Sequence, residues 1–351
     1  MLLHIVLLDA IPEMKKSSST ISTAILSSLL FFLALPSLYL AARAEPCNAE
    51  DQKTLLEIKA ALNNPDELAS WNPDTDCCRW HALACDQNTG RIIALGIFHG
   101  NISGHIPPAV GSLPSLQVLV LRKIPDLRGE IPSTISKLNN LSFLRISYTN
   151  LSGPVPSFLS QLKNLGVLDL SHNNLKGSIP PSLSQLPRLF SLHLEYNKLT
   201  GSIPDSFGRF AGTFTDLFLS HNLLTGPVPK SFGNLEFRFR IDLSRNMLEG
   251  DASFLFGKDK SIMSLDLSRN LFAFNLSKIE FPDSLVNLDL SHNNIFGRLP
   301  EGLAELNLGG LNVSYNSLCG QIPRGGKLQS FGYLTYFNNR CLCGAPLPAC
   351  N

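Results

Sequence analysis

Residues 168–180, Leu-Asp-Leu-Ser-His-Asn-Asn-Leu-Lys-Gly-Ser-Ile-Pro, decide the fold of this chain. The leucines at the start alternate with polar residues, which indicates a short half-buried β-strand with the leucines inside. Asn173 ends the strand, where its amide can satisfy backbone groups of the turning chain. Gly177 permits the turn, and Pro180 ends the pairing. A short helical piece at residues 182–186 then completes one coil.

The coil repeats along most of the chain. Its asparagine returns every 23 to 25 residues, at Asn173, Asn197, Asn222, Asn246, Asn270, Asn293 and Asn316. Three earlier coils carry other residues at this place, so we expect about ten coils in total. This period is typical of leucine-rich repeats. The predicted fold is an α/β solenoid, a right-handed superhelix of plant-type leucine-rich repeats with a concave parallel β-sheet.

The repeats occupy residues 91–323, and a stack of coils needs a cap at each end because its terminal coils expose an apolar face. Residues 45–90 are the expected N-terminal cap, with apolar residues at helical spacing and two tryptophans able to cover the first coil. Residues 324–351 are the expected C-terminal cap. The element LxGxIP that follows the asparagine is lost in two consecutive coils, at residues 248–253 and 271–276.

The first 44 residues have the pattern of a secretory leader. Met14 is followed by two lysines, an apolar stretch over residues 21–40, and Ala42-Arg43-Ala44. This is a charged region, an apolar region and a cleavage site. Serines and a proline interrupt the apolar stretch, which argues against a membrane anchor. We expect residues 1–44, including an extension before Met14, to be removed.

The charge of the remaining chain limits its partners. The leader contains three of the cations and two of the anions, so the formal net charge of +1 falls to about zero without it. Nucleic-acid binding requires a strongly positive surface, and attraction to anionic lipid also requires cations. We therefore expect neither a nucleic-acid nor a membrane partner, and a secreted, extracellular monomer.

The eight cysteines lie four near each end of the mature chain. An even number in a secreted chain indicates disulfides, whereas the one-residue gap between Cys341 and Cys343 is wrong for a zinc site. Spacing alone does not choose among the possible pairings. The disulfide residues are Cys47, Cys77, Cys78, Cys85, Cys319, Cys341, Cys343 and Cys350.

The outward strand positions form the candidate binding surface, because only there does the chemistry vary from coil to coil. Aromatic and arginine anchors with surrounding charges are typical of protein interfaces. The alternative is an ordinary solvated strand face, but two phenylalanines expected to be exposed favour binding. The predicted protein-binding residues are Phe143, Arg145, Ser147, Tyr148, Asp169, Ser171, His172, His193, Glu195, Asp216, Phe218, Arg240, Asp242, Met263, Asp266 and Asp289.

No catalytic, metal or cofactor site is predicted. Ser, His and Asp recur at residues 169–172 and 289–292, but these phrases follow the repeat consensus and name no point where a triad would converge. Gly325-Gly326-Lys327 lacks the spacing of a phosphate-binding loop. Five N-x-S/T sequons are candidate glycosylation sites in a secreted chain. They are Asn101, Asn140, Asn150, Asn275 and Asn312, of which Asn312 falls on the concave strand.

Three segments together resemble one known family. They are residues 76–85, with Asp-Cys-Cys, Trp80 and Cys85; residues 245–253, Arg-Asn-Met-Leu-Glu-Gly-Asp-Ala-Ser; and the tail, residues 339–350. With ten plant-type coils between the caps, the chain resembles the polygalacturonase-inhibiting proteins of plants. The two coils without LxGxIP also match that family.

The resemblance implies a function and a set of residues. Members of the family bind fungal endopolygalacturonases through the concave sheet and block the substrate cleft in plant defence. Carried over, the acidic cluster that faces the enzyme would be Asp169, Glu195 and Asp242, at equivalent outward positions. The implied disulfides are Cys47–Cys77, Cys78–Cys85, Cys319–Cys341 and Cys343–Cys350. Many members are basic and bind cell-wall pectin, so a neutral chain is expected to bind pectin only weakly.

Two other functions stay open. One is a binding module for a peptide or plant protein in signalling or development. The other is ice binding, since an offshoot of the same family is an antifreeze protein. Ice binding would require a flat array of short polar side chains, and Phe143, Tyr148 and Phe218 interrupt such an array here.

Overall fold

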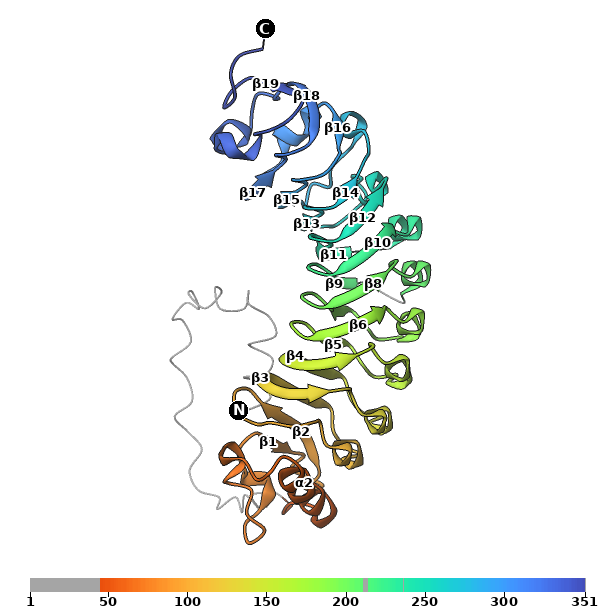
Figure 1. Ribbon diagram of the computed structural model, residues 1–351, viewed down its shortest axis with the longest axis vertical. Coiled ribbons are helices and arrows are strands. Elements are labelled where there is room, and N and C mark those ends of the chain that lie inside the picture. Colours follow the sequence, from red (N-terminus) through yellow and green to blue (C-terminus); the bar gives the residue numbers. More distant parts are fainter. Residues whose placement is uncertain (1–44, 211–213, 236, 351) are drawn as a thin grey trace, which may run out of the picture.

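The structure, a computed structural model, describes residues 45–210, 214–235 and 237–350. The predicted leader, residues 1–44, lies outside the described residues. The described chain forms a curved stack of coils that runs from the N-terminal cap to the C-terminal cap (Figure 1). Among the described residues, no helix is both long enough and apolar enough to cross a membrane.

Ten parallel strands of the described chain line the concave side, one for each expected coil, and they belong to a 16-stranded sheet. The core leucines of the repeat lie in register; for example, Leu168 lies between Leu144 and Leu192. The strands are β2 (Ile92–Ile97), β3 (Val118–Gly129), β4 (Phe143–Gly153), β5 (Val167–Asp169), β7 (Ser191–His193), β9 (Phe214–Phe218), β11 (Phe237–Asp242), β13 (Ser264–Asp266), β15 (Asn287–Asp289) and β17 (Gly310–Asn312).

A second set of parallel strands follows the asparagine of each coil and pairs beside the first. Its strands are β6 (Asn174–Ser178), β8 (Lys198–Gly201), β10 (Leu223–Pro227), β12 (Met247–Gly250) and β14 (Leu271–Phe272). A separate sheet near the C-terminus contains β16 (Phe296–Gly297), β18 (Ser317–Gln321) and β19 (Cys341–Cys343).

Short 3-10 helices form the convex side, where a helical piece at residues 182–186 was predicted (Figure 1). Those of the repeats are η4 (Pro108–Ser112), η5 (Ser133–Lys137), η6 (Ser157–Gln161), η7 (Pro181–Gln185), η8 (Asp205–Arg209), η9 (Lys230–Asn234), η10 (Ser253–Leu255), η11 (Leu276–Lys278) and η12 (Glu301–Glu305). The two shortest, η10 and η11, belong to the coils that lost LxGxIP, so the sequence change alters the coil locally without interrupting the stack.

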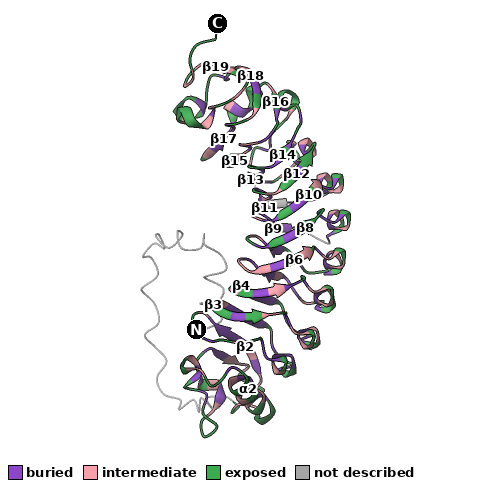
Figure 2. Ribbon diagram, in the orientation of Figure 1, coloured by how far each residue is buried: buried purple, intermediate pink, exposed green. Residues whose placement is uncertain are grey.

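The core runs continuously through all coils, because each coil buries its leucines against the next (Figure 2). The repeated asparagine holds neighbouring coils together. Asn197 Nδ2 donates to Leu170 O at 2.9 Å in the preceding coil, and Asn197 Oδ1 accepts from Leu175 N at 3.0 Å. The same pattern returns at Asn222. The predicted role of this amide is therefore confirmed.

The N-terminal cap covers the first coil with a helix and two tryptophans. Helix α2 (Ala49–Ala61) begins at Asn48, whose side chain accepts from two backbone N–H groups. It is followed by η2 (Asp66–Leu68), η3 (Cys77–Arg79) and β1 (Leu83–Cys85), which pairs antiparallel with β2. Trp71 and Trp80 are buried and stacked, with ring centroids 5.8 Å apart. Both rings belong to the same continuous core as Ile92 and Leu95 of β2.

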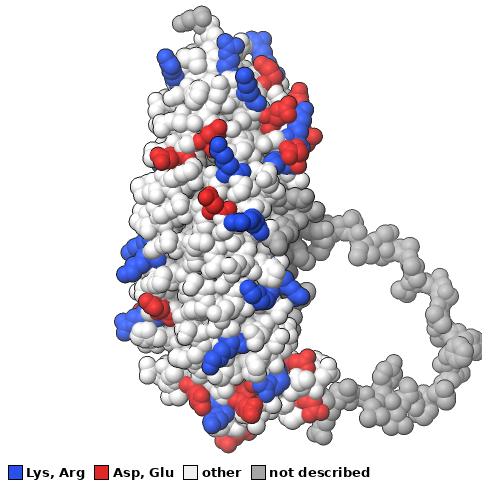
Figure 3. All heavy atoms as spheres, turned by 90° about the vertical axis from the view of Figure 1, so that its right-hand side faces the viewer, with Lys and Arg blue, Asp and Glu red and all other residues white. Residues whose placement is uncertain are grey.

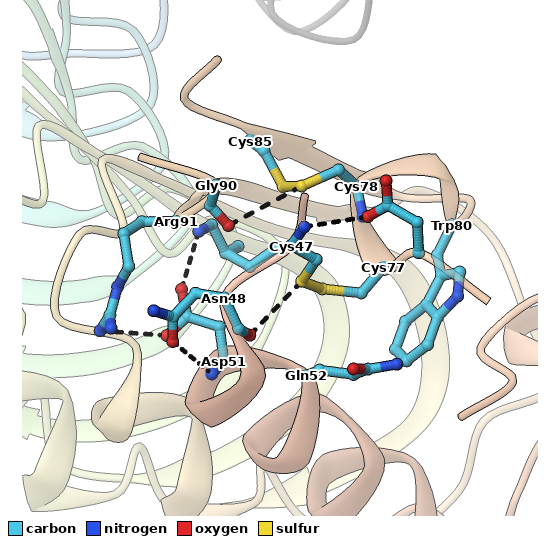
Figure 4. Close-up of a disulfide and its surroundings, with 12 residues drawn as sticks. Cys47, Asn48, Asp51, Gln52, Cys77, Cys78, Trp80, Cys85, Gly90 and Arg91 are labelled. Atoms are coloured by element: carbon cyan, nitrogen blue, oxygen red, sulfur yellow. Dashed lines mark hydrogen bonds and ion pairs between the residues drawn. A yellow bond between two sulfur atoms is a disulfide. The ribbon is translucent and has the colours of Figure 1, made fainter. Parts of the chain in front are cut away.

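Both caps contain two disulfides, and the pairs are those that the family resemblance implied. At the N-terminal end, Cys47–Cys77 and Cys78–Cys85 lie side by side, and Asp76 Oδ1 accepts from Cys47 N and Cys78 N (Figure 4). The nearby sulfurs of Cys47, Cys78 and Cys85 could be mistaken for a metal site. Each is bonded to another sulfur, so none is a thiolate ligand.

The C-terminal cap closes the last coil with β19 and two short helices, η13 (Leu328–Ser330) and η14 (Tyr333–Thr335). Cys319–Cys341 joins β18 to β19, and Cys343–Cys350 ties down the tail. Tyr336 is fully buried and donates its hydroxyl to Leu328 O at 2.8 Å. Burial removes the ring from water and raises the pKa of Tyr336.

Candidate functional site

The concave surface contains rows of side chains, to which each coil from the second or third onward contributes one residue. We name four rows by their place in the coil. The leading row precedes the first core leucine: Val118, Phe143, Val167, Ser191, Asp216, Arg240, Ser264, Asn287 and Gly310. The middle row lies between the two leucines: Val120, Arg145, Asp169, His193, Phe218, Asp242, Asp266, Asp289 and Asn312.

The other two rows follow the second leucine. The serine row is Ser147, Ser171, Glu195, Ser220, Ser244, Ser268, Ser291 and Ser314. The edge row is Lys123, Tyr148, His172, Tyr196, His221, Arg245, Arg269, His292 and Tyr315, and every member has a positive φ between 53° and 57°. Each of these residues has a left-handed backbone conformation at the end of its strand. This conformation turns its side chain toward one edge of the sheet.

The expected acidic cluster needs correction, because its three members are not equivalent. Asp169 and Asp242 belong to the middle row, whereas Glu195 lies two residues further along its coil, in the serine row. His193 holds the middle-row position of that coil, between Asp169 and Phe218. Glu195 therefore lies in the row next to the middle row, which contains Asp169 and Asp242.

Asp169 is also not free to contact a partner. Its Oδ2 accepts from Arg145 Nε at 2.7 Å, its Oδ1 accepts from Ser171 N and Oγ, and the residue is only 5% exposed. Burial alone would oppose ionisation, but His193, Arg145 and the Ser171 hydrogen bonds hold the pKa of Asp169 below its usual value. Asp169 is thus an internal anion that is already neutralised.

Phe143 was expected to be exposed, and this is wrong. It is 7% exposed and packs with Ala94, Val118 and Val120 in a small apolar cluster on β2, β3 and β4. The guanidinium of Arg145 lies over its ring, 5.2 Å from the centroid. The apolar residues of three neighbouring strands meet here, so Phe143 stabilises the sheet.

A Ser–His–Glu arrangement that the sequence reasoning missed lies on β7 and the residues after it. Ser191 Oγ lies 2.9 Å from His193 Nε2, and His193 Nδ1 lies 3.6 Å from Glu195 Oε1. The alternating positions 191, 193 and 195, which point to one face of a strand, could have revealed it.

This arrangement is unsuited to hydrolysis. Ser191 is buried, and a catalytic base must be able to accept the serine proton. Burial alone lowers the pKa of His193, but Glu195, Asp169 and Asp216 together raise it above its usual value. These carboxylates favour the protonated form of the ring, and that form cannot accept the serine proton. The expected phrase Asp169-Ser171-His172 does not converge either, because His172 is stacked between Tyr148 and Tyr196.

Beyond the centre of the sheet, the concave face contains a hollow of about 550 Å³. Three carboxylates of the middle row stand along it on neighbouring strands, Asp242, Asp266 and Asp289. Each accepts a hydrogen bond at Oδ1 from the backbone N–H of the serine two residues later. None of the three forms an ion pair with a described residue. We call this hollow the acidic trough.

The trough concentrates negative charge that forms no ion pair within the described part of the chain. Burial, together with the flanking carboxylates Asp242 and Asp289, raises the pKa of Asp266 to about 6. Adjacent strands lie about 4.8 Å apart, so these like charges repel one another strongly in a partly desolvated site. A cation brought into the trough would relieve this repulsion.

Phe218 lines the trough at its boundary with the neutralised centre. His193 stacks on one side of its ring at 4.7 Å, and Arg240 lies over the ring at 5.3 Å. Arg240 is itself held by Asp216, with Nε 2.8 Å from Oδ1. Phe218 is partly exposed and is held in place from two coils, which is the state of an interface anchor.

Part of the edge row forms a column of stacked rings at the margin of the trough. Tyr148, His172, Tyr196 and His221 stack in sequence at 3.9 to 4.1 Å. Arg245 and Arg269 follow on the next two coils, and both are exposed. Burial is the main reason that the pKa values of His172 and His221 lie below the usual value. The trough is therefore acidic on its floor and has two arginines on its margin.

The remaining predicted residues occupy different places. Ser147 and Ser171 are buried in the serine row, and Tyr148 is exposed at the edge. Met263 precedes β13 and belongs to none of the four rows. Four sequons have exposed asparagines, Asn101, Asn140, Asn150 and Asn275. The fifth, Asn312, is partly buried and lines the trough, where its Nδ2 lies 3.4 Å from Asp289 Oδ2.

The convex face differs in character from the concave face. Its basic and acidic side chains are scattered and intermixed (Figure 3). A face of this kind offers no concentrated field to steer a charged partner. The acidic trough is therefore the stronger candidate for recognition.

Comparisons with known proteins cover almost the whole chain. A family model described as "Leucine rich repeat N-terminal domain" matches residues 48–86, and "Leucine rich repeat" models match 139–199, 213–235 and 284–306. A "Polygalacturonase inhibitor" of Vitis vinifera is 58% identical, covering 93% of this chain and 98% of the relative. One of Pyrus communis is 57% identical, covering 94% and 98%. The crystal structure of a plant ice-binding protein is similar with a TM-score of 0.85 and 53% identity, covering 88% of this chain and 99% of that one.

Proposed function

Because the chain belongs to the polygalacturonase inhibitor family, we propose that it is a secreted defence protein that binds fungal endopolygalacturonases through its concave face. A polygalacturonase holds an anionic polymer, so its cleft must present cations. The acidic trough offers Asp242, Asp266 and Asp289, which form no ion pair with any residue that the structure describes, and this observation carries the proposal. Occupation of the cleft by this surface excludes the polymer.

The surface divides into a structural part and a contact part. Arg145 and Asp169 neutralise each other, so they stabilise the sheet beside the contact area. Phe218 supplies an apolar anchor, and the carboxylates of the trough supply steering and charge pairing. The protein acts as a monomer without catalytic chemistry of its own.

Inhibition assays test the proposal. The measurement is the release of reducing sugar from polygalacturonate by a panel of fungal polygalacturonases, with increasing amounts of the protein. The triple variant Asp242→Asn, Asp266→Asn, Asp289→Asn should inhibit about tenfold less well or worse, because the partner cations lose their counter-charges. The control triple variant Asp205→Asn, Asp283→Asn, Glu301→Gln removes the same charge from exposed residues outside the trough. Equal inhibition by both triple variants would refute the role of the trough.

Weak pectin binding is a subsidiary proposal. The chain without its leader has about no net charge, but Arg245 and Arg269 are exposed on neighbouring coils. Two cations at this spacing could pair with carboxylates of a uronate polymer, although the trough beside them repels the same polymer. Sedimentation with insoluble pectin at low and high salt measures this binding.

Ice binding is a second candidate because of the similarity to a plant ice-binding protein. The only regular row of short polar side chains among the four concave rows is the serine row, and its serines are buried. Ice contact would therefore need another face. Measurement of thermal hysteresis with the purified protein tests ice binding. If the protein inhibits no polygalacturonase in a wide panel, a role as a binding module in signalling is favoured instead.

A further inference from the structure

The C-terminal cap extends the concave face by one coil beyond the ten that the repeat predicts. Residues 334–339, Leu-Thr-Tyr-Phe-Asn-Asn, have the phrase LxLxxN. The segment pairs with coil ten, because Val313 N donates to Thr335 O at 2.9 Å. Asn339 acts as the repeated asparagine does, since its Nδ2 donates to Val313 O at 3.0 Å and its Oδ1 accepts from Leu318 N at 3.1 Å. The cap therefore forms the end of the concave face beside β17 (Figure 1).

The chemistry of the concave face changes where the cap begins. The middle row contains Asp289 on β15, Asn312 on β17 and, by the same register, Thr335 in the cap. The charge of this row thus ends inside the trough. In the serine row the cap supplies Phe337, whose carbonyl oxygen accepts from Tyr315 N at 2.9 Å. Beyond the trough, an aromatic ring therefore replaces the short polar side chain of the repeat.

A continuous chain of rings connects the margin of the trough to the cap. His292 lines the trough and stacks on Tyr315, with ring centroids 4.2 Å apart. The ring of Phe337 meets Tyr315 edge-on at 5.8 Å and lies 5.4 Å from Tyr333. Tyr315 is 41% exposed, Tyr333 is 47% exposed, and Leu334 is 75% exposed although it holds the place of a core leucine. We call Tyr315, Tyr333, Leu334 and Phe337 the cap patch. Grouped apolar exposure of this kind is typical of a contact surface.

A protein that covers the trough is large enough to reach the cap patch. A stable protein interface buries about 800 Å² on each partner, a footprint roughly 30 Å across. From Phe218 on β9, the sheet passes through β11, β13, β15 and β17 to the cap. At about 4.8 Å for each step, these five steps span about 24 Å. A contact that extends from Phe218 over the trough therefore also covers the cap patch.

We infer that the cap patch is a second anchor for the polygalacturonase, and that it contacts an apolar side chain on the rim of the enzyme's basic cleft. The carboxylates of the trough pair with cations of the cleft, while Tyr333 and Leu334 bury apolar surface beside them. A cation of the partner meets no carboxylate at Asn312 or Thr335, so the matching surface there is apolar. The inference rests on the proposed function, because it names the part of the same partner that meets the cap.

Inhibition assays with matched variants test the inference. Tyr333→Ser with Leu334→Ser should weaken inhibition of a susceptible fungal polygalacturonase about tenfold, because the complex loses an aromatic and an aliphatic contact. Thermal unfolding should stay unchanged, since both side chains are exposed. The control is Leu271→Ser with Phe296→Ser, which removes one leucine and one ring that are 50% and 45% exposed on β14 and β16 and do not line the trough. The control should inhibit within about twofold of the unchanged protein.

Photo-crosslinking identifies the occupant of the cap patch directly. Benzoylphenylalanine in place of Leu334 should form an adduct with the enzyme, and mass spectrometry should locate the adduct at an apolar side chain beside the cations of the cleft. An adduct with a second copy of this chain, or no adduct in an inhibited complex, would overturn the inference. So would equal inhibition by the cap variant and its control, while the triple variant of the trough still inhibits poorly. Failure of the proposed function looks different, because the unchanged protein then inhibits no enzyme of the panel and both proposals are lost.

Discussion

Arg145 donates its Nε to Asp169 Oδ2 at 2.7 Å across β4 and β5, and both side chains are almost completely buried. The two residues are 24 positions apart, one coil of the solenoid. His193 lies beside Asp169 on the next strand, and His193 and Arg145 both lower the pKa of Asp169. This network stiffens the centre of the concave sheet and separates the apolar cluster at Phe143 from the acidic trough.

Replacing Asp169 should therefore damage the fold before it damages binding. Asp169→Asn keeps the shape but leaves Arg145 without a counter-ion in a buried site, which costs about 3–5 kcal/mol. Urea unfolding should show this loss. Asp205→Asn on η8, where the carboxylate is exposed, should change the free energy of unfolding by less than about 0.5 kcal/mol. An Asp169→Asn variant as stable as the parent would contradict the assignment of this pair.

The sequence predicts the rows of the sheet better than the contacts between them. The period of Asn173 and its equivalents yields ten coils, and the described residues form ten concave strands in register. However, the period does not reveal that Arg145 reaches Asp169, because this contact joins two outward positions that look solvated in each coil alone. The same limit applies to Phe143, whose burial depends on Val118 and Val120 in the neighbouring strand.

Position within a coil is a second limit. The resemblance implied that Asp169 and Glu195 are equivalent, whereas the strand register places His193 beside Asp169. Glu195 lies one residue after the second core leucine of its coil, and Asp169 lies between the two core leucines of its own. The raised pKa of Asp266 cannot be predicted from the repeat pattern, because it depends on burial and on two carboxylates from other coils.

The stability of the protein should depend on pH through Asp266. The pKa of this group is 3.8 in its unperturbed state and about 6 in the fold. The folded state therefore holds its proton between these values, so the stabilising contribution is full below about 3.8 and is lost as pH rises through 6. Asp266→Asn keeps the hydrogen bond from Ser268 and cannot ionise.

The variant should thus be more stable than the parent at pH 7.5, by on the order of 1–3 kcal/mol, and nearly equal to it at pH 4. Urea unfolding at both pH values measures the difference. Asp283→Asn, an exposed carboxylate, serves as the control. A constant difference between Asp266→Asn and the parent across this range would argue against a raised pKa.

Binding should release a proton from the same group. A partner cation in the trough favours the ionised form of Asp266, so its pKa falls when the complex forms. Calorimetry of the complex at pH 6, in two buffers with different ionisation enthalpies, should show proton release. Asp266→Asn should abolish the share of the proton release that comes from Asp266. Unchanged proton release in the variant would assign the linkage to another group.

The two disulfides of the C-terminal cap should differ in their stabilising effect. Cys319–Cys341 spans 22 residues and joins β18 to β19, while Cys343–Cys350 spans only seven. Because the entropy lost by the unfolded chain grows with loop length, the expected contributions are about 3 and about 2 kcal/mol. Paired Cys→Ser variants and thermal unfolding test the order. A larger loss from the seven-residue disulfide would show that strain or packing outweighs loop entropy.

The last prediction separates an interface anchor from an ordinary exposed ring. Phe218 is held between His193 and Arg240 at the edge of the trough, so its position is fixed before a partner arrives. A preorganised aromatic residue beside complementary charges typically contributes at least 2 kcal/mol to binding. Phe218→Ala should therefore weaken inhibition by about 30-fold with little change in thermal unfolding. Phe190→Ala is the matched control, because Phe190 is 44% exposed but does not line the trough. Equal effects of the two substitutions on inhibition would show that Phe218 is not part of the interface. A loss of inhibition confined to Phe218→Ala would place the centre of the contact between the network around Asp169 and the carboxylates of the acidic trough.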